Sequence, residues 1–494
     1  MVIVSGSVLL LLPFFVVQIL PLQDYPNHLA RMYVLGHIAD SAALQEFYQV
    51  SWKPIPNLGM DLIVPGMLLL FSIETAGKVF CAFVLLSTAP AVTLLHYALH
   101  KKLSLWPLLS LLFVYNSVFV MGFLNYLLGL NLALAASALW ILSRQKRATY
   151  SAPLFSAVTL VLYFVHLSAL GVYAVIVFGY ELAVYFETKG QQAVQHKIPW
   201  GAALLQFAPP VVLFISASPT FDISLRSAGN LSVWFKLQGI YSVFDSGNRL
   251  MDVPYFLSIA TMAVAAASLR AISFHSRAWV AFWMLTGAFL ALPEVFFGSA
   301  YASYRLFIAV VLFAIAASDP RPANRWMLGS AGAMLTILFL VRSAVIVEAW
   351  HGYGDEQRQV IDAAYVMQEG SRVLPYVVRQ DSYDFIMKPP ILHLATLAVI
   401  YRHAFVPTLF TDPSQQPLRI SDKYDRLSWK WPRQDIPRDL FSKSLDDPGN
   451  PLHESAVGEF DYVWLFSPTP RRFTVPASFK KAATGGKFTL YQVK

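Results

Sequence analysis

Long apolar runs separated by short polar segments dominate the first 347 residues of the chain. A helix needs about 20 predominantly apolar residues to cross a bilayer, and about eleven runs reach or approach that length. These runs are 2–20, 77–99, 104–121, 123–143, 151–167, 169–187, 198–216, 253–272, 278–297, 302–318 and 326–347. The pattern predicts an α-helical polytopic membrane protein with about eleven transmembrane helices.

The first apolar run, 2–20, has two interpretations. A secretory signal peptide has basic residues before its apolar core and a small-x-small cleavage site after it. The chain has no Lys or Arg before the run and no such site at its end. We therefore expect an uncleaved first transmembrane helix.

The segment 58–71 decides the predicted topology. It is short for a transmembrane helix and contains Asp61 and Pro65. If it does not cross, the Lys and Arg residues of five short loops fall on one side, which the positive-inside rule makes cytoplasmic. We therefore predict that it is re-entrant or interfacial, with the N-terminus cytoplasmic and the C-terminus outside. The basic residues concerned are Lys101, Lys102, Arg144, Lys146, Arg147, Lys189, Lys197, Arg270, Arg277, Arg321 and Arg325.

Three segments then face outside: 21–76, 217–252 and 348–494. The amphipathic pattern over 27–50 is typical of helices that lie along a membrane surface. The tail is richer in Pro and Asp, and we predict an extracytoplasmic α/β domain over 348–494 after a transmembrane domain over 1–347. In this tail we expect helices at 357–367 and 391–403 and strands at 372–378, 405–410, 462–466 and 488–493.

Composition and charge exclude several classes of protein. The chain is 56% hydrophobic and only 13% charged, which excludes an ordinary soluble globule. The single cysteine, Cys81, excludes an internal disulfide framework and a cysteine-based metal site. Most of the net charge of +8 belongs to the membrane half, because the tail carries 18 Lys and Arg against 17 Asp and Glu. No basic stripe with interleaved aromatic residues occurs, so a nucleic-acid partner is not expected.

The most informative polar cluster follows the first apolar run and reads DYPNHLAR from Asp24. Pro26 suits a first helical turn, and Asp24 or Asn27 suits an N-cap. Asp24, His28 and Arg31 then share one helix face, beside a helix N-terminus that favours an anion such as phosphate. The alternative is that Asp24 only caps the helix while His28 and Arg31 contact lipid headgroups.

Other polar residues lie toward the outer ends of the predicted helices, as expected around a polar cavity that opens outward. For Arg305 the alternatives are a phosphate clamp and a headgroup contact. Glu294 either pairs with Arg305 or takes part in catalysis, and His166 either lines the cavity or only bonds a neighbouring helix. The set comprises Asp61, Asn125, Tyr126, His166, Glu294, Arg305 and Arg342.

Some polar residues are expected to have plainer roles. Asp61 could simply cap a short helix. The charged residues of the second external loop are expected to be mostly solvated, and they are Asp222, Arg226, Asp245, Arg249 and Asp252. The sequence has no glycine-rich phosphate loop, HExxH motif or nucleophile elbow.

The order of segments resembles the integral-membrane glycosyltransferases of the GT-C fold, which include protein mannosyltransferases and bacterial enzymes that modify surface glycolipids. The shared features are one span, a long external loop that opens with an acidic residue, interfacial helices, a helix bundle and an external C-terminal domain. The stretch 71–102 is also similar to the second-span region of this family. Many members carry an acidic pair where this chain has Gln23 and Asp24, and some carry a second Asp where it has Gly122 to Asn125.

This resemblance implies an enzyme that moves a sugar, with inversion, from a polyprenyl-phosphate donor to a glycolipid, glycan or protein acceptor outside a bacterial inner or plasma membrane. It implies that Asp24 is the general base. Arg305, helped by Arg31 or His28, would stabilise the charge of the leaving phosphate.

The resemblance leaves the remaining site residues less defined. His166, Glu294 and Asn125 are further candidates for substrate or phosphate binding. Some family members use a divalent metal, Mg or Mn, which Asp24 and His28 would hold here.

Three other classes of function stay open. A transporter or lipid flippase predicts inverted repeats and charges at the membrane midplane, and the sequence displays neither. A ligase or polymerase of lipid-linked glycans usually carries its key residues on a large later loop, whereas the loop 217–252 is modest. A sensor or scaffold whose tail binds a partner is a third, weaker alternative.

Overall fold

The fold is taken from a computed structural model of the chain. The structure describes residues 2–144, 148–189, 200–217, 232–296, 301–321, 325–378, 390–428, 435–436, 457–467 and 475–493.

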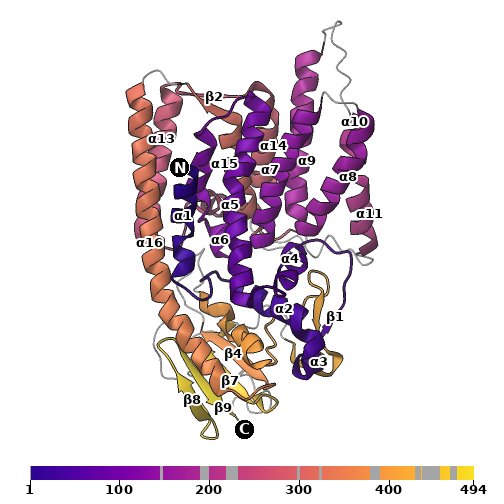
Figure 1. Cartoon of the computed structure of the whole chain (residues 1–494), viewed down its shortest axis with the longest axis vertical. Coiled ribbons are helices and arrows are strands. Elements are labelled where there is room, and N and C mark those ends of the chain that lie inside the picture. The colour runs from indigo at the N-terminus through magenta and orange to yellow at the C-terminus, as the bar shows by residue number, and fades with distance from the viewer. Residues whose placement is uncertain are drawn as a thin grey trace.

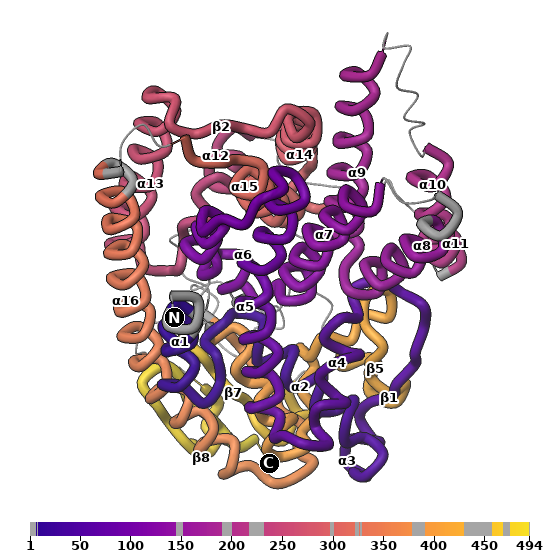
Figure 2. Tube along the Cα trace, turned by 45° about the horizontal axis from the view of Figure 1, so that its top comes forward, coloured from indigo at the N-terminus to yellow at the C-terminus, as the bar shows by residue number. Residues whose placement is uncertain are grey.

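Helices form an elongated bundle with a mixed α/β unit at one end (Figure 1). In the bundle, α5 packs along α7, and α9 packs against both α7 and α14. The pair α13 and α16 lies at one side of the bundle, and α8, α10 and α11 lie at the opposite side (Figures 1 and 2). The bundle helices are α1 (Val2–Phe15), α5 (Ile73–His100), α7 (Leu124–Ser143), α8 (Ala148–Val165), α9 (Leu167–Thr188), α10 (Trp200–Leu205), α11 (Ala208–Ala217), α12 (Val233–Tyr241), α13 (Arg249–Ser268), α14 (Trp279–Ala291), α15 (Ala302–Ala317) and α16 (Arg325–Val366).

Among the described residues, five helices are long and apolar enough to cross a membrane: α5, α7, α9, α13 and the part Gly329–Val366 of α16. Shorter apolar helices accompany them, for example Ala302–Ala317. The chain is therefore a helical membrane protein. These lengths do not by themselves reproduce the predicted count of about eleven spans.

Two predicted spans are interrupted. The run 104–121 forms a 3-10 helix, η2 (Trp106–Phe113), and a separate short helix, α6 (Ser117–Val120). Asn116 caps α6 by accepting a hydrogen bond from the Phe119 amide at 3.1 Å, which favours a new helix start inside the apolar run. The run 198–216 divides into α10 and α11, just before two consecutive prolines that cannot donate backbone hydrogen bonds.

The segment 58–71 contains the short helix α4 (Gly59–Met67). Its nine residues extend about 13.5 Å, less than half of a bilayer core of about 30 Å. This length agrees with the predicted interfacial or re-entrant helix. The amphipathic segment before it forms α2 (Tyr25–His37), η1 (Ile38–Asp40) and α3 (Ala42–Phe47).

A five-stranded mixed sheet forms the other end of the molecule, in the order β6-β4-β7-β9-β8. Its strands are β4 (Val373–Val378), β6 (Asp435–Ile436), β7 (Tyr462–Phe466), β8 (Lys480–Thr484) and β9 (Phe488–Gln492). Strand β4 runs parallel to β6 and β7, whereas β9 runs antiparallel to β7 and β8. The 3-10 helix η4 (Pro390–Thr396) lies against β4 and β7, and helix α17 (Leu397–Arg402), which follows it, packs against α16 and α2. Three of the four predicted strands form, but 405–410 contributes only an isolated bridge between Phe405 and Arg372.

Helix α16 joins the bundle to the sheet. It has 42 residues, or about 63 Å, and the predicted domain boundary after residue 347 falls inside it. Arg342 on this helix donates to the carbonyl oxygens of Tyr115 and Phe244 at 2.6 and 2.8 Å, which joins α16 to the interrupted run 104–121 and to the segment after α12. A continuous helix therefore crosses the predicted domain boundary.

The first loop packs on the tail. Strand β1 (Tyr48–Val50) pairs antiparallel with β5 (Leu418–Ile420). The buried Tyr48 hydroxyl donates to the Ala404 carbonyl at 3.2 Å and accepts from the Val406 amide at 3.1 Å. The 3-10 helix η5 (Asp422–Leu427) follows β5. Segments from opposite ends of the sequence thus form one folded unit.

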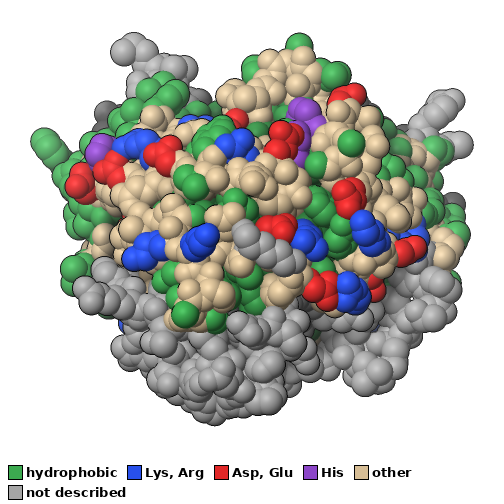
Figure 3. All heavy atoms as spheres, turned by 90° about the horizontal axis from the view of Figure 1, so that it is seen from below, with side chains coloured by type: hydrophobic (Ala, Val, Ile, Leu, Met, Phe, Trp, Pro, Cys, Tyr) green, Lys and Arg blue, Asp and Glu red, His purple; other side chains and the backbone are tan. Residues whose placement is uncertain are grey.

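Several loops that the sequence assigns to the cytoplasmic side meet at the end of the bundle opposite the sheet. There β2 (Ile272–Phe274) pairs with β3 (Ser318–Pro320), and Lys102 at the end of α5 forms a 2.6 Å ion pair with Asp319 (Figure 1). On the sheet end, charged side chains of both signs are intermixed over the described part of the face (Figure 3). Such mixed charge is typical of a water-exposed surface.

Candidate functional site

Asp24 lies where the chain enters α2, against a turn of the bundle at 120–122. The Gln23 amide donates to the Val120 carbonyl at 2.8 Å, and the Asp24 amide donates to the Met121 carbonyl at 3.2 Å. Gly122 has φ +91°, and a Cβ at this position would lie 3.1 Å from the Cβ of Asp24. Both the backbone conformation and the close approach require glycine. The backbone of Asp24 is therefore held firmly against the bundle.

The Asp24 carboxylate does not cap the helix that it precedes. Asp24 occupies the N-cap position of α2, yet its side chain makes no capping hydrogen bond. Its Oδ1 lies 3.4 Å from Nε2 of His393, a residue of η4 in the tail, and the side chain is 16% exposed. The alternative in which Asp24 only caps a helix is therefore wrong.

Asn27 links α2 to the tail beside this contact. Its Nδ2 donates to the Thr408 carbonyl at 2.8 Å, and its Oδ1 accepts from the Phe410 amide at 2.7 Å. The same Nδ2 lies 3.2 Å from Nδ1 of His393. Asn27 and His393 are both buried, so this part of the site is closed to bulk water.

His28 follows Asp24 by one helical turn. Burial, together with the charge of Arg31, lowers the pKa of His28 to about 3 against the opposing charge of Asp24. The imidazole is therefore neutral near pH 7, so it can bind a substrate only through a hydrogen bond. Its Nδ1 is buried and has no hydrogen-bond partner among the described residues.

Arg31 pairs with Asp61 of α4. Its Nε and Nη2 donate to the two carboxylate oxygens of Asp61 at 2.8 and 3.0 Å, and both side chains are buried. This contact contradicts the headgroup alternative for Arg31 and the capping alternative for Asp61. The pair joins α2 to α4 and engages Nε and Nη2 of Arg31, whereas its buried Nη1 has no hydrogen-bond partner among the described residues.

Arg305 lies in the first turn of α15 and faces the same turn as Asp24. The carbon of its guanidinium is 3.7 Å from the centre of the Phe123 ring, and its Nη1 is 3.5 Å from Nε2 of His166. Arg305 is close enough to Asp24 for their charges to interact. The Tyr126 hydroxyl donates to the Arg305 carbonyl at 2.5 Å. The structure thus brings together side chains that the sequence places on α2, α15 and the α8–α9 turn.

The two remaining candidates, Asn125 and Glu294, take part in hydrogen bonds that involve the backbone. The Asn125 amide accepts from the Met60 backbone at 2.7 Å and donates to the Asn57 carbonyl at 2.6 Å, so it anchors the segment before α4. Glu294 lies in the turn before α15, and its carbonyl accepts from the Ala302 amide at 2.9 Å. Glu294 therefore borders the helix that carries Arg305.

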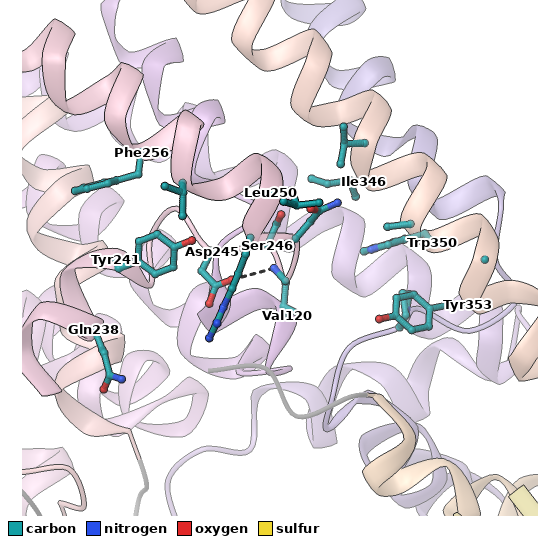
Figure 4. Close-up of a pocket in the computed structure, with 18 of the residues that line it drawn as sticks. Val120, Gln238, Tyr241, Asp245, Ser246, Leu250, Phe256, Ile346, Trp350 and Tyr353 are labelled. Atoms are coloured by element: carbon teal, nitrogen blue, oxygen red, sulfur yellow. Dashed lines mark hydrogen bonds between the residues drawn. The ribbon is translucent and has the colours of Figure 1, made fainter. Parts of the chain in front are cut away.

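A cavity of about 1130 Å³ opens between α12, α13 and α16, next to this cluster (Figure 4). Apolar side chains such as Phe256 and Ile346 line one part, whereas Asp245 and Ser246 line another. Pro21 and Val120 also line it, so the cavity and Asp24 adjoin the same backbone contact. Among the described residues, neither Asp24 nor Arg305 lines it.

Asp245 on this cavity wall and Asp252 on the adjoining helix α13 are buried, which corrects the prediction that they are solvated, whereas Arg249 is exposed as predicted. Burial raises the pKa of Asp245 to about 6. Asp245 accepts from the Ser117 hydroxyl at 3.1 Å, and Asp252 accepts from the amides of Ser246 and Asn248 at 2.8 and 3.0 Å. These bonds compensate for the lost hydration. Asp222 and Arg226 lie outside the described residues.

No family model and no curated protein matches this sequence. Among solved structures, it is similar over its whole length to ArnT from Cupriavidus metallidurans bound to undecaprenyl phosphate. The TM-score is 0.51 at 10% identity, and the match covers 100% of this chain and 97% of that chain. The apo structure of the same ArnT gives a TM-score of 0.50 at 11% identity, covering 100% and 98%. At this identity the likeness shows the fold alone, and it confirms the GT-C fold that the sequence suggested.

Sequence reasoning missed His393 as a partner of Asp24. The two segments are separated by more than 360 residues, and His393 belongs to no recognisable motif. The predicted helix at 391–403 placed it in a regular element but on no particular face. Only the docking of the first loop on the tail reveals the contact.

The predicted metal ligands, Asp24 and His28, make a thin ligand set. Across the part of the chain that the structure describes, no three His, Cys, Asp or Glu side chains are grouped closely enough to hold an ion. Mg and Mn prefer several oxygen ligands, and Asp24 alone would supply a carboxylate here. The described residues around Asp24 therefore do not fit a resident divalent cation.

Proposed function

We propose that this protein is a membrane glycosyltransferase that moves a sugar from a polyprenyl-phosphate donor to an acceptor hydroxyl on the extracytoplasmic side. The observation that carries the proposal is the Asp24 carboxylate. This carboxylate does not cap α2, faces His393, and is close enough to Arg305 for their charges to interact. A full-length likeness to the fold of an ArnT structure that contains undecaprenyl phosphate supports it.

Asp24 acts as the general base. The acceptor oxygen attacks the anomeric carbon of the donor from the face opposite the phosphate, and its proton passes to the Asp24 carboxylate. The bond between the anomeric carbon and the phosphate oxygen breaks, and its electron pair leaves with polyprenyl phosphate. Inversion follows because a single displacement exchanges the two oxygens. A positioned carboxylate typically contributes about 10²–10⁴-fold to such a step.

Arg305 stabilises the leaving phosphate. Its guanidinium is permanently charged, and contact with the Phe123 ring and His166 restricts its orientation. A preorganised cation in a site with little water stabilises developing negative charge far better than one in solution. His28 supports the phosphate only as a neutral hydrogen-bond partner. The ion pair with Asp61 fixes the position of Arg31, and its buried Nη1 is left to bond the phosphate.

The cavity between α13 and α16 accommodates the lipid part of the donor. Only 11% and 17% of the membrane-crossing windows of these two helices are buried within the protein, so most of their surface faces lipid. A volume of about 1130 Å³ exceeds that of usual drug-sized pockets, which reach about 1000 Å³. The cavity has room for a sugar phosphate together with the first prenyl units.

The test uses purified full-length protein and a panel of undecaprenyl-phosphate-linked monosaccharides, with release of undecaprenyl phosphate as the readout. We expect Asp24→Asn to reduce turnover by at least about 10²-fold. Asp40→Asn is the matched control, because Asp40 lies on the same loop and is exposed, and it should keep wild-type turnover. Binding of undecaprenyl phosphate, measured by native mass spectrometry, should be unchanged in both variants.

Full turnover by the folded Asp24→Asn variant would contradict the assignment of Asp24 as the base. Uptake of an intact lipid-linked sugar by proteoliposomes, without release of undecaprenyl phosphate, would instead identify a transporter. Severe loss in Arg249→Ala with normal activity in Asp24→Asn would favour a ligase or polymerase.

A further inference from the structure

Three buried or half-buried side chains form a line across the junction between the first loop and the tail. Asp24 and Asn27 come from α2, and His393 comes from η4. One imidazole nitrogen of His393 faces the Asp24 carboxylate, and the other faces the Asn27 amide. The line therefore connects the proposed base, Asp24, through His393 to the buried amide of Asn27.

The orientation of the Asn27 amide is fixed by two backbone groups. Its oxygen accepts from the Phe410 amide, and its nitrogen donates to the Thr408 carbonyl. If the amide were rotated by 180°, its nitrogen would face the Phe410 N–H and its oxygen would face the Thr408 carbonyl, so neither hydrogen bond could form. The nitrogen of Asn27 must therefore point toward His393.

This orientation determines the tautomer of His393. Because Asn27 Nδ2 is a donor, Nδ1 of His393 accepts and carries no proton. The single proton of the neutral ring then sits on Nε2, 3.4 Å from Oδ1 of Asp24. Asn27 thus directs a hydrogen-bond donor at the proposed base.

The imidazole of His393 is packed so that it cannot readily turn. Its side chain is 1% exposed, and its ring lies edge-on to the Phe410 ring with centres 5.1 Å apart. The Thr396 hydroxyl donates to the His393 carbonyl at 2.7 Å and stiffens η4. The charged or titratable groups around this contact are Asp24, His28 and Arg31 on the first loop and Arg305 on α15.

We propose that His393 is a positioning residue, which holds the Asp24 carboxylate in its reactive orientation through the proton on Nε2 that Asn27 fixes there. The inference rests on the proposed function. Asp24 makes no capping bond, so without His393 its side chain would be free to rotate away from the acceptor. His393 itself gives up no proton during the reaction.

Two conservative variants separate positioning from packing. In His393→Gln, the side-chain amide can accept from Asn27 and direct its NH2 group toward Asp24. In His393→Asn, the shorter side chain can keep the contact with Asn27 but cannot reach Asp24. We expect His393→Asn to lose about 10²-fold in kcat with a donor KM within about twofold of wild type, because a misplaced base costs rate rather than binding. His393→Gln should stay within about fivefold of wild type.

A measurement independent of activity tests the tautomer. Histidine-selective ¹⁵N labelling of the full-length protein at pH 7.5 should show His393 with its proton on Nε2. In Asn27→Asp, the carboxylate only accepts, so the proton should move to Nδ1. A folded Asn27→Asp protein that keeps the Nε2 proton would overturn the inference.

The outcomes separate this inference from the proposed function. Equal kcat values for His393→Asn and His393→Gln, together with an inactive Asp24→Asn, would overturn the role of His393 and leave the glycosyltransferase proposal standing. Full activity of Asp24→Asn would overturn both. A selective loss in His393→Asn with the expected tautomer supports the inference.

Discussion

Arg31 and Asp61 form a buried, two-pronged ion pair that joins α2 to α4. Their nitrogen–oxygen distances are 2.8 and 3.0 Å, and the side chains are 2% and 1% exposed. Charge-assisted bonds of this geometry are strong. Because both side chains are buried, each replaces the water that the other has lost, so removing one leaves the other charge uncompensated. The loop that carries Asp24 therefore relies on this pair for its position over the bundle.

The first prediction concerns this ion pair. Asp61→Ala leaves Arg31 charged and buried without its partner, so we expect a loss of about 3–5 kcal/mol in the free energy of unfolding. The double variant Arg31→Met/Asp61→Leu removes both charges and should recover most of that loss. Denaturant unfolding measures both, with Asp40→Ala as an exposed control that changes stability by less than about 0.5 kcal/mol. A double variant no more stable than Asp61→Ala would contradict the assignment.

The second prediction concerns Gly122. Gly122→Ala forces a side chain into a left-handed conformation and against Asp24, so we expect a loss of about 1–3 kcal/mol and a fall in turnover. Gly66→Ala is the matched control, because a Cβ at Gly66 meets nothing within 4 Å. It should stabilise the protein by up to about 1 kcal/mol. Thermal unfolding and turnover measure both, and wild-type turnover in Gly122→Ala would show that the turn does not position Asp24.

The third prediction concerns pH. Because the pKa of His28 is about 3 in the folded protein and its ordinary value is 6.5, the unfolded chain binds an additional proton between these values. Stability should therefore fall as pH decreases from 6.5 toward 3. His28→Gln lacks this proton, so its melting temperature should decrease less steeply with falling pH. Identical slopes for the two proteins would show that His28 is not buried in its neutral form.

The fourth prediction concerns Arg305. Arg305→Gln removes the cation, so we expect kcat to fall about 10²–10³-fold. Arg305→Lys keeps the charge but loses the planar contact with Phe123, so it should recover only part of this activity. Arg321→Gln, at an exposed position beside β3, is the control and should be fully active. Equal activity of the lysine and wild-type enzymes would show that orientation of the guanidinium is unimportant.

The fifth prediction concerns the cavity. Ala349 on α16 lines it, so Ala349→Trp should occupy space needed by the prenyl chain and raise the KM for an undecaprenyl donor. A donor with a short prenyl chain should be affected less. Ala344→Trp is the control, because Ala344 lies exposed on the same helix and is not among the described lining residues. An unchanged KM for the long donor would place the lipid elsewhere.

Local sequence signals predicted the elements around Asp24 well. Pro26 and the spacing of Asp24, His28 and Arg31 indicated a helix start, and α2 begins at Tyr25. The prediction that outer helix ends meet also holds for Arg305 and His166. These features depend on neighbouring residues along one helix or on the depth of a residue in a membrane span. Both can be read from a single sequence.

Pairings between distant segments were not predictable in the same way. Nothing in the sequence couples Arg31 to Asp61, because either residue could cap a helix or meet water. The apolar run 104–121 has the length of a span, but the cap at Asn116 interrupts it. The change in composition after residue 347 suggested a boundary, whereas α16 continues through it because its outer part packs on strand β8 and α17. Tertiary contacts decided these cases.

Because the Asp24 region is completed by residues of the tail, it cannot be assembled until the tail has been synthesised. Asn27 emerges from the ribosome 366 residues before His393. At about 5–20 residues per second, the first loop waits about 20–70 s for the segment that completes it. Throughout that interval the nascent chain has its early helices but lacks the contacts that Asp24 and Asn27 make with His393, so the Asp24 region is assembled only after the segment around His393 has been synthesised.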